Sequence, residues 1–119
     1  MVLILQRCNS AFVHISGRFH SSIKKGLVLF LGVEKTDKRD DVDIILKKVL
    51  GLRVFNDENN KTNLSIRDVN GSILLISQFT LCADLKSGKR PSFTKAAKFE
   101  EAETIYNYFI NQLKKINKI

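Results

Sequence analysis

The segment GLVLFLGV, residues 26–33, is an almost continuous apolar run that begins and nearly ends with glycine. Runs of this kind are typical of a strand that is buried on both faces, because neither set of alternate side chains then meets water. The preceding segments Val2–Cys8 and Ala11–Ile15 also favour strands, and Ser16-Gly17 ends the second one. Residues 1–33 therefore predict a sheet.

Two helices are predicted from apolar residues that recur at helical spacing. Thr36-Asp37 offers an N-cap for the first helix, Asp40-Asp41 places negative charge in its first turn, and Gly51 marks its end. The second helix is expected from about Phe99 to Ile116. The apolar stripes are Val42, Ile45, Leu46, Val49 and Leu50 in the first helix, and Ala102, Ile105, Tyr106, Phe109, Leu113 and Ile116 in the second.

Short strands and turns are expected between the helices. Leu52 to Phe55 predicts a short strand, and Asn56 to Asn60 a polar turn. Arg67 to Gly71 ends in Asn-Gly, the signal of a tight hairpin. Ser72 to Leu81 predicts the last strand. Runs of strands with only two helices favour an α+β fold over a doubly wound sheet, and 119 residues indicate one domain, residues 1–119.

The composition narrows the class of partner. Lys and Arg number 20 against 12 Asp and Glu, which gives a formal net charge of +8. This excess favours a polyanion, nucleic acid above all, although a solubilising surface would look the same. No apolar run approaches the roughly 20 residues of a membrane helix. Because the N-terminus looks like a first strand rather than a secretory signal, we expect a cytoplasmic protein, or an organellar one whose targeting segment has been removed.

Several kinds of catalytic site find no support in the sequence. The chain lacks a glycine-rich phosphate loop, and its two histidines, His14 and His20, do not pair with other ligands at zinc spacing. Cys8 and Cys82 lie in apolar segments, where a free cysteine usually acts as a small hydrophobe. A thiol hydrolase built on Cys82 and a histidine is a weak alternative, because nothing in the sequence orients such a pair.

A polar cluster interrupts the last predicted strand. Ser77, Gln78 and Thr80 surround Phe79, and a strand that ends at a pocket could offer its unpaired backbone N–H groups to an oxyanion. The alternative is an ordinary strand end at a solvent-facing edge. The basic loop KSGKRP, residues 86–91, follows; it could bring phosphate-binding charge to the cluster or be a solvated turn.

Taken together, these and other short motifs resemble the D-aminoacyl-tRNA deacylases, which free tRNA from D-amino acids. The resemblance covers essentially the whole chain in family order. The matching residues are Gln6-Arg7, Gly26-Leu27, Leu31-Gly32-Val33-Glu34-Lys35, Arg53-Val54-Phe55, Lys61-Thr62-Asn63-Leu64, Ser77-Gln78-Phe79-Thr80-Leu81 and Gly88-Lys89-Arg90-Pro91-Ser92-Phe93.

The resemblance implies a compact curved sheet or barrel with two helices, paired as a homodimer. It implies hydrolysis of the ester between tRNA and a D-amino acid or glycine, without a metal or organic cofactor. Ser77, Gln78, Phe79 and Thr80 would form the reaction site, with backbone N–H groups near Phe79 and Thr80 holding the oxyanion. Either Thr80 is the nucleophile or the tRNA 2′-hydroxyl assists; we favour the second, because no base for Thr80 is evident.

The resemblance also implies binding residues and a partner. The expected contacts to substrate and tRNA are Arg7, Lys86, Lys89, Arg90, Pro91 and Phe93. Arg7 would steady a Gly-Pro segment of the partner subunit. In the family that segment lies in strands beyond the last helix and excludes L-amino acids, whereas the only proline printed here is Pro91. The alternative function is therefore a catalytically inactive, tRNA-binding paralogue.

Overall fold

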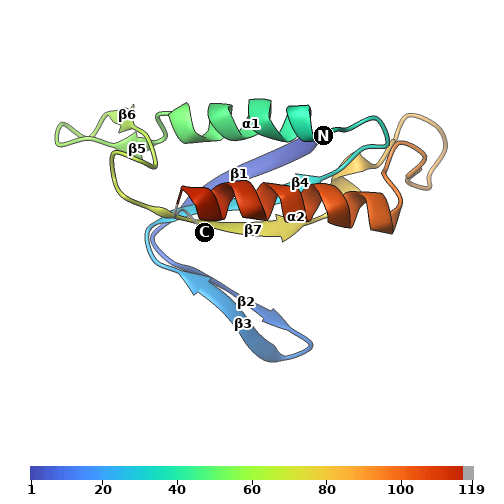
Figure 1. The fold of residues 1–119 in the computed structure, drawn as a ribbon, viewed down its shortest axis with the longest axis horizontal. Coiled ribbons are helices and arrows are strands. Elements are labelled where there is room, and N and C mark those ends of the chain that lie inside the picture. Colours follow the sequence, from blue (N-terminus) through green and yellow to red (C-terminus); the bar gives the residue numbers. More distant parts are fainter. Residues whose placement is uncertain (117–119) are drawn as a thin grey trace.

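The centre of the fold is a three-stranded sheet in the order β1-β4-β7 (Figure 1). The computed structural model describes residues 1–116. In it, β1 is Val2–Cys8, β4 is Gly26–Gly32 and β7 is Ser72–Ser77. β1 is antiparallel to β4, and β7 is parallel to it. The apolar run at 26–33 thus supplies the middle strand, as its pattern predicts.

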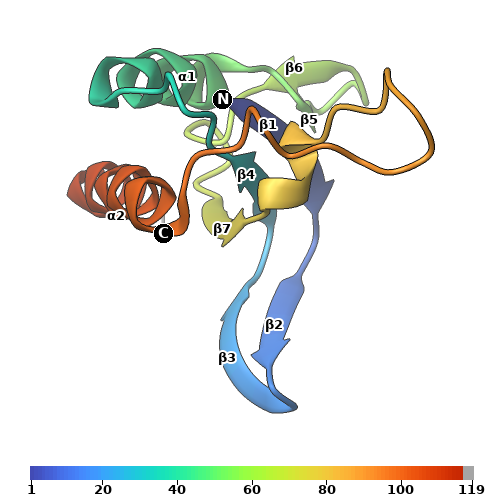
Figure 2. The same ribbon diagram turned by 90° about the vertical axis from the view of Figure 1, so that its right-hand side faces the viewer.

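Both helices cover the same face of this sheet (Figure 2). They are α1, Arg39–Gly51, and α2, Phe99–Lys115, close to the predicted ranges. Alternate residues of β4 and β7 meet the predicted helical stripes in one core, which confirms the α+β class with two helices. The fully buried members include Leu27, Leu29, Leu31, Ile73, Val42, Phe109 and Leu113.

A two-stranded hairpin projects from one end of the sheet (Figures 1 and 2). It consists of β2, Ala11–Ile15, and β3, Arg18–Ile23. The turn uses left-handed backbone at Ser16 (φ 51°) and Gly17 (φ 76°), as tight hairpin turns require. β3 was not predicted, because its sequence RFHSSI is mostly polar and exposed and so lacks an apolar pattern.

The connection between α1 and β7 differs from the prediction. The strand expected at Leu52 to Phe55 is instead β5, Phe55–Asn56, which pairs with β6, Thr62–Leu64. Asn70-Gly71 forms a turn, with Asn70 at φ 51°, but the hairpin prediction is wrong because the flanking strands β6 and β7 pair with different partners. Both β5 and β6 are too short to show a period in the sequence.

The last strand is shorter than predicted. β7 ends at Ser77, and Phe79–Cys82 form a short 3₁₀ helix, η1, so the prediction of a strand to Leu81 is wrong.

The sheet within residues 1–116 is open, with β1 and β7 at its edges, and so the expected barrel is not closed there. In the described range, no helix is both long and apolar enough to span a membrane.

The first helix also begins later than predicted. Its N-cap is Lys38 rather than Thr36-Asp37, and the Lys38 N–H donates to Asp41 Oδ2 at 2.8 Å. Asp40 and Asp41 do lie in the first turn, and the helix ends at Gly51, as expected. Asp37 is not available as a cap because its carboxylate binds the N-terminus of the chain at Met1.

Candidate active site

The residues Ser77–Thr80, hereafter the SQFT turn, connect β7 to η1. The Gln78 N–H donates to Leu31 O at 2.7 Å, which extends the contact between β7 and β4 by one residue. Leu81 N–H then donates to Gln78 O at 3.3 Å, the first bond of the 3₁₀ turn. The N–H groups of Phe79 and Thr80 have no acceptor among residues 1–116, because the first residues of such a helix have no preceding carbonyl in reach.

The side chains of the turn are accessible. Ser77 and Thr80 are exposed, and 57% of the Phe79 surface is open to solvent. The Gln78 side-chain amide donates to the Thr80 hydroxyl. No carboxylate or imidazole of the described residues is hydrogen-bonded to that hydroxyl, so Thr80 has no base to remove its proton. The turn offers two backbone donors and a fixed hydroxyl rather than an activated nucleophile.

Close packing against β4 holds η1 in place. A methyl group on Gly32 would lie 2.9 Å from Cys82 Sγ, 3.0 Å from Leu81 Cβ and 3.2 Å from Gln78 O. The buried Cys82 thiol donates to Val33 O over 3.6 Å. Burial, followed by the nearby Glu34 charge, raises the pKa of this thiol. A buried thiol with a raised pKa is a poor nucleophile, which argues against the thiol-hydrolase alternative.

An ion-pair cluster at the N-terminus supports the same end of β4. The Met1 amine donates to Glu34 Oε1 at 2.8 Å and to Asp37 Oδ1 at 3.0 Å. The Met1 and Asp37 side chains are only 5% and 8% exposed. Burial alone would lower the pKa of the amine, but the hydrogen bonds to the two carboxylates outweigh burial and raise this pKa. The cluster fixes the chain just after Val33, which contacts Cys82.

The basic loop lies next to the turn in the chain and is closed by a backbone bridge. Asp84 and Ser92 exchange two N–H to O bonds of 2.7 and 2.9 Å, and the Lys86 N–H donates to Asp84 Oδ1 at 2.9 Å. Lys86, Lys89, Arg90 and Pro91 are exposed on the loop, and none of the three cations has an ion-pair partner among residues 1–116. Their charges are therefore free for an anion.

One aromatic contact joins the turn to the loop. The rings of Phe79 and Phe93 lie 5.2 Å apart between centroids, tilted by 60°. Both rings remain partly open to solvent, Phe93 at 38%. The structure therefore brings Phe93 to the SQFT turn. Lys86, Lys89, Arg90 and Pro91 lie on the exposed loop that connects the two in the chain, and their closeness to the turn stays a prediction.

The sequence and the fold were compared with known proteins. The family model described as D-Tyr-tRNA(Tyr) deacylase matches residues 4–119. The chain belongs to this family. The D-aminoacyl-tRNA deacylase of Thermodesulfovibrio yellowstonii is 49% identical over 114 residues, 96% of this chain and 78% of that protein. The D-aminoacyl-tRNA deacylase of Listeria innocua is also 49% identical, over 95% of this chain and 75% of its own length.

Two solved structures share the fold of this chain. A c-Myc DNA unwinding element binding protein superposes with a TM-score of 0.89 at 36% identity, covering 96% of this chain and 76% of that one. A probable eukaryotic D-amino acid tRNA deacylase gives a TM-score of 0.84, covering 98% of this chain and 68% of that one. Its identity is only 12%, so it supports the fold alone.

Arg7 does not join the other predicted deacylase site residues within one chain. It pairs with Leu27 near the start of β4, whereas Ser77 pairs with Leu31 near its end. Four residues along a strand correspond to roughly 13 Å. The Arg7 guanidinium instead donates to Val54 O at 2.9 Å and Asn56 Oδ1 at 3.3 Å, which ties β1 to β5. Its contact with a partner subunit stays a prediction.

Some supporting residues were not singled out from the sequence. Gly32 was matched to the family, but its close approach to η1 needs the fold to be seen. The Met1 cluster joins residues more than 30 positions apart, and no local pattern reports that. Within residues 1–116, no group of three or more His, Cys, Asp or Glu side chains could hold a metal ion, and His14 and His20 are exposed on the hairpin.

Proposed function

We propose that the SQFT turn is the reaction site of a D-aminoacyl-tRNA deacylase. Family membership makes the chain a hydrolase of the ester bond that joins a D-amino acid to tRNA. The observation that carries the assignment of the site is the pair of unpaired N–H groups on Phe79 and Thr80. They lie on a turn that packs closely against Gly32 of β4, and donors positioned in this way stabilise charge with little reorganisation.

In the proposed reaction, water attacks the ester carbonyl carbon and forms a tetrahedral intermediate. The negative charge that develops on the carbonyl oxygen is held by the N–H groups of Phe79 and Thr80. The C–O bond to the ribose then breaks, and the ribose oxygen leaves with a proton. Since Thr80 has no base, we assign the proton transfer to the neighbouring 2′-hydroxyl of the substrate.

The basic loop is proposed to position the tRNA. Lys86, Lys89 and Arg90 are exposed on the loop that follows the turn, without ion-pair partners among residues 1–116, and phosphate contacts of this kind fix register without reading sequence. Each phosphate neutralised on a duplex should add about 0.9 to the negative slope of log affinity against log salt. Lys89→Ala and Arg90→Ala should weaken binding of every tRNA by a similar factor, and a flat salt response of the wild type would contradict this assignment.

The assembly is proposed to be a homodimer of single domains in the cytoplasm. Support comes from the sheet face away from the helices, which carries apolar side chains that the described residues leave partly open. Ile4 is 49% exposed, and Phe30 and Ile76 are only partly buried. An apolar face of this kind is expected where a second subunit packs.

The experiment that tests the site compares Thr80→Ala with a change in the substrate. If backbone donors and the 2′-hydroxyl carry the reaction, Thr80→Ala should cost about tenfold or less, near 1.4 kcal/mol of barrier. A D-aminoacyl-tRNA whose terminal ribose lacks the 2′-hydroxyl should then react far more slowly. A loss of many thousandfold in Thr80→Ala, with the modified tRNA still active, would make Thr80 the nucleophile.

The same assay decides between the enzyme and an inactive tRNA-binding paralogue. Wild-type protein should release D-amino acid, and glycine, from tRNA, and the L-aminoacyl ester is assayed beside them to measure chiral selection. Binding of tRNA without hydrolysis of any ester would favour the paralogue.

A further inference from the structure

We propose that the β2–β3 hairpin, residues Ala11–Ile23 and hereafter the arm, is a stacking surface for unpaired bases of the tRNA. This rests on the proposed function for the identity of the RNA. It assigns a second contact region, away from the SQFT turn, to residues that the resemblance did not mark.

The outer face of the arm carries three rings that no residue in the range 1–116 covers. Phe12 is 67% exposed and Phe19 63% exposed, and His14 lies between them. The ring centroids of Phe12 and His14 are 5.2 Å apart, and those of His14 and Phe19 are 6.2 Å apart. Since His14 and Phe19 are paired across the two strands, the three rings form one row on one face.

A row of exposed rings is not explained by the stability of the fold. An isolated two-stranded ribbon is marginally stable, and its outer rings contribute nothing to the core, which contains no residue of the arm. Aromatic faces that stay in water are instead suited to flat partners. Bases stack on such side chains with little regard to sequence, because every base has a π face.

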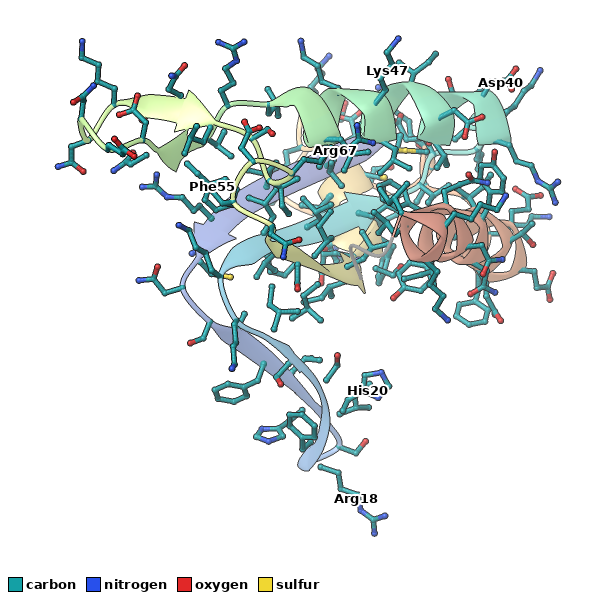
Figure 3. All side chains as sticks on the ribbon, turned by 60° about the vertical axis from the view of Figure 1, so that its left-hand side comes forward. Arg18, His20, Asp40, Lys47, Phe55 and Arg67 are labelled. Carbon is teal, nitrogen blue, oxygen red and sulfur yellow. The ribbon has the colours of Figure 1, made fainter. Side chains whose placement is uncertain are left out.

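The charges around the arm favour a polyanion over a second copy of the chain. Residues 1–33 contain Arg7, Arg18, Lys24 and Lys25 but no Asp or Glu. Figure 3 shows Arg18 extending from the tip of the arm, away from the rest of the molecule. Two identical arms packed on each other would bring these like charges together, whereas a phosphate backbone would neutralise them.

The position of the arm is compatible with a tRNA whose aminoacylated end lies at the SQFT turn. One hollow lies between the arm, β7 and α2, and its lining runs from Ile15 and His20 on the arm to Ser77 on the turn. None of the side chains that line this hollow is a carboxylate. A single strand that leaves the turn can therefore follow the hollow to the arm without meeting negative charge. Val13, Ile15 and His20 line the hollow, whereas Phe12, His14 and Phe19 alternate with them, so the strand must pass around the edge of the arm to reach the rings.

The test removes the rings while keeping an apolar side chain. The double variant Phe12→Leu/Phe19→Leu should bind uncharged tRNA about tenfold more weakly than wild type at fixed low salt, the expected loss for one stacked base. Phe12→Trp/Phe19→Trp keeps the π faces and should restore binding. Ile44→Ala removes an isoleucine that is 69% exposed on α1 and is the matched control, which should bind like wild type.

A second measurement separates the arm from the reaction site. With D-aminoacyl-adenosine, which has one nucleoside and cannot reach the arm, the leucine double variant should turn over like wild type. Equal losses on this small ester and on D-aminoacyl-tRNA would overturn the proposal, because the substitutions would then be acting through the turn.

Two further outcomes also overturn it. Unchanged tRNA affinity in the leucine variant would exclude stacking, and a simultaneous loss of self-association in sedimentation equilibrium would assign the rings to a contact between copies. If wild type hydrolyses neither ester, the proposed function fails. The tRNA affinities of the leucine, tryptophan and wild-type proteins would still test the role of the arm, because they do not depend on hydrolysis.

Discussion

At one end of β4, Gly26 lies against the backbone of Ser72, so closely that a methyl group on Gly26 would overlap the Ser72 carbonyl oxygen. At the other end, Gly32 lies against η1, where an added methyl group would meet Cys82 Sγ at 2.9 Å. The two glycines serve the same geometric need in one strand, yet their surroundings differ. The Gly26 end joins only strands, whereas the Gly32 end joins β4 to the turn that carries the unpaired donors.

The difference separates what maintains the fold from what positions the reaction. Around Gly26 the contacts are backbone to backbone, so any side chain there must push β4 and β7 apart. Around Gly32 the neighbours are the side chain of Cys82 and a short helix that can shift. We therefore expect changes at the first end to reduce stability, and changes at the second to reduce activity more than stability.

The largest effect is expected for Gly26→Ala. Separating β7 from β4 would break the parallel ladder, and overpacking of a backbone contact should lower the free energy of unfolding by about 3 kcal/mol or more. Urea unfolding followed by circular dichroism measures this change. Gly51→Ala, at a helix position with open space around it, is the control and should not destabilise the protein. An unchanged urea midpoint in Gly26→Ala would show that the Gly26 contact does not maintain the fold.

Gly32→Ala should have a smaller effect on stability and a larger one on catalysis. A shift of η1 by a few tenths of an ångström moves the Phe79 and Thr80 N–H groups away from the oxyanion, and poorly placed donors cost about a hundredfold in kcat. The free energy of unfolding should fall by only about 1–2 kcal/mol. A stability loss equal to that of Gly26→Ala, with full kcat in the folded fraction, would show that the two ends are alike.

Cys82→Ala tests whether the Cys82 side chain is the neighbour that limits the space around Gly32. Removing the buried sulfur should cost about 1 kcal/mol of stability while deacylation stays within a fewfold of wild type. In the double variant Gly32→Ala/Cys82→Ala, the new methyl group has more room, so kcat should partly recover. Loss of activity by orders of magnitude in folded Cys82→Ala would instead support thiol chemistry.

The smallest effect is a loss of stability at alkaline pH. The pKa of the Met1 amine is raised from 8.0 by Glu34 and Asp37, so its stabilisation is complete below about pH 8 and is lost as pH rises through the higher folded value. The raised pKa of Cys82 acts in the same direction above about pH 9. Urea midpoints between pH 7 and 9.5 should therefore fall.

Asp37→Asn is the matched control for this pH effect, because asparagine keeps the size and loses the charge. Its midpoint should be lower at pH 7 and should change less between pH 8 and 9.5 than that of wild type. An equal fall in both proteins would mean that the amine does not contribute.

The strong periodic segments could be predicted from sequence, and the weak ones could not. The run at 26–33 and the two helical stripes each bury many apolar side chains, so their patterns are set by the core. β3 buries little, and β5 and β6 are too short to show a period. The Asn-Gly turn was recognised, but local sequence does not determine which strand β7 pairs with.

The candidate site could also be predicted from the sequence only in part. The polar cluster at Ser77, Gln78 and Thr80 was visible, and so was the basic loop. The change from strand to 3₁₀ helix was not, because Phe79 and Leu81 continue an alternating apolar pattern that fits either structure. The unpaired donors that a strand end was expected to supply come instead from the start of η1. The N-terminal ion pairs depend on residues brought together only by the fold.

The parallel pairing of β4 with β7 also determines the order in which the molecule can assemble. β1 reaches β4 through the short connection that contains the arm, but β7 must return across residues 33–71, which include α1 and the β5–β6 pair. Closing the longer loop costs more chain entropy, and contacts between distant residues form slowly. The SQFT turn follows β7, so its support is completed last. During refolding, helical and sheet signals should therefore recover before deacylation does.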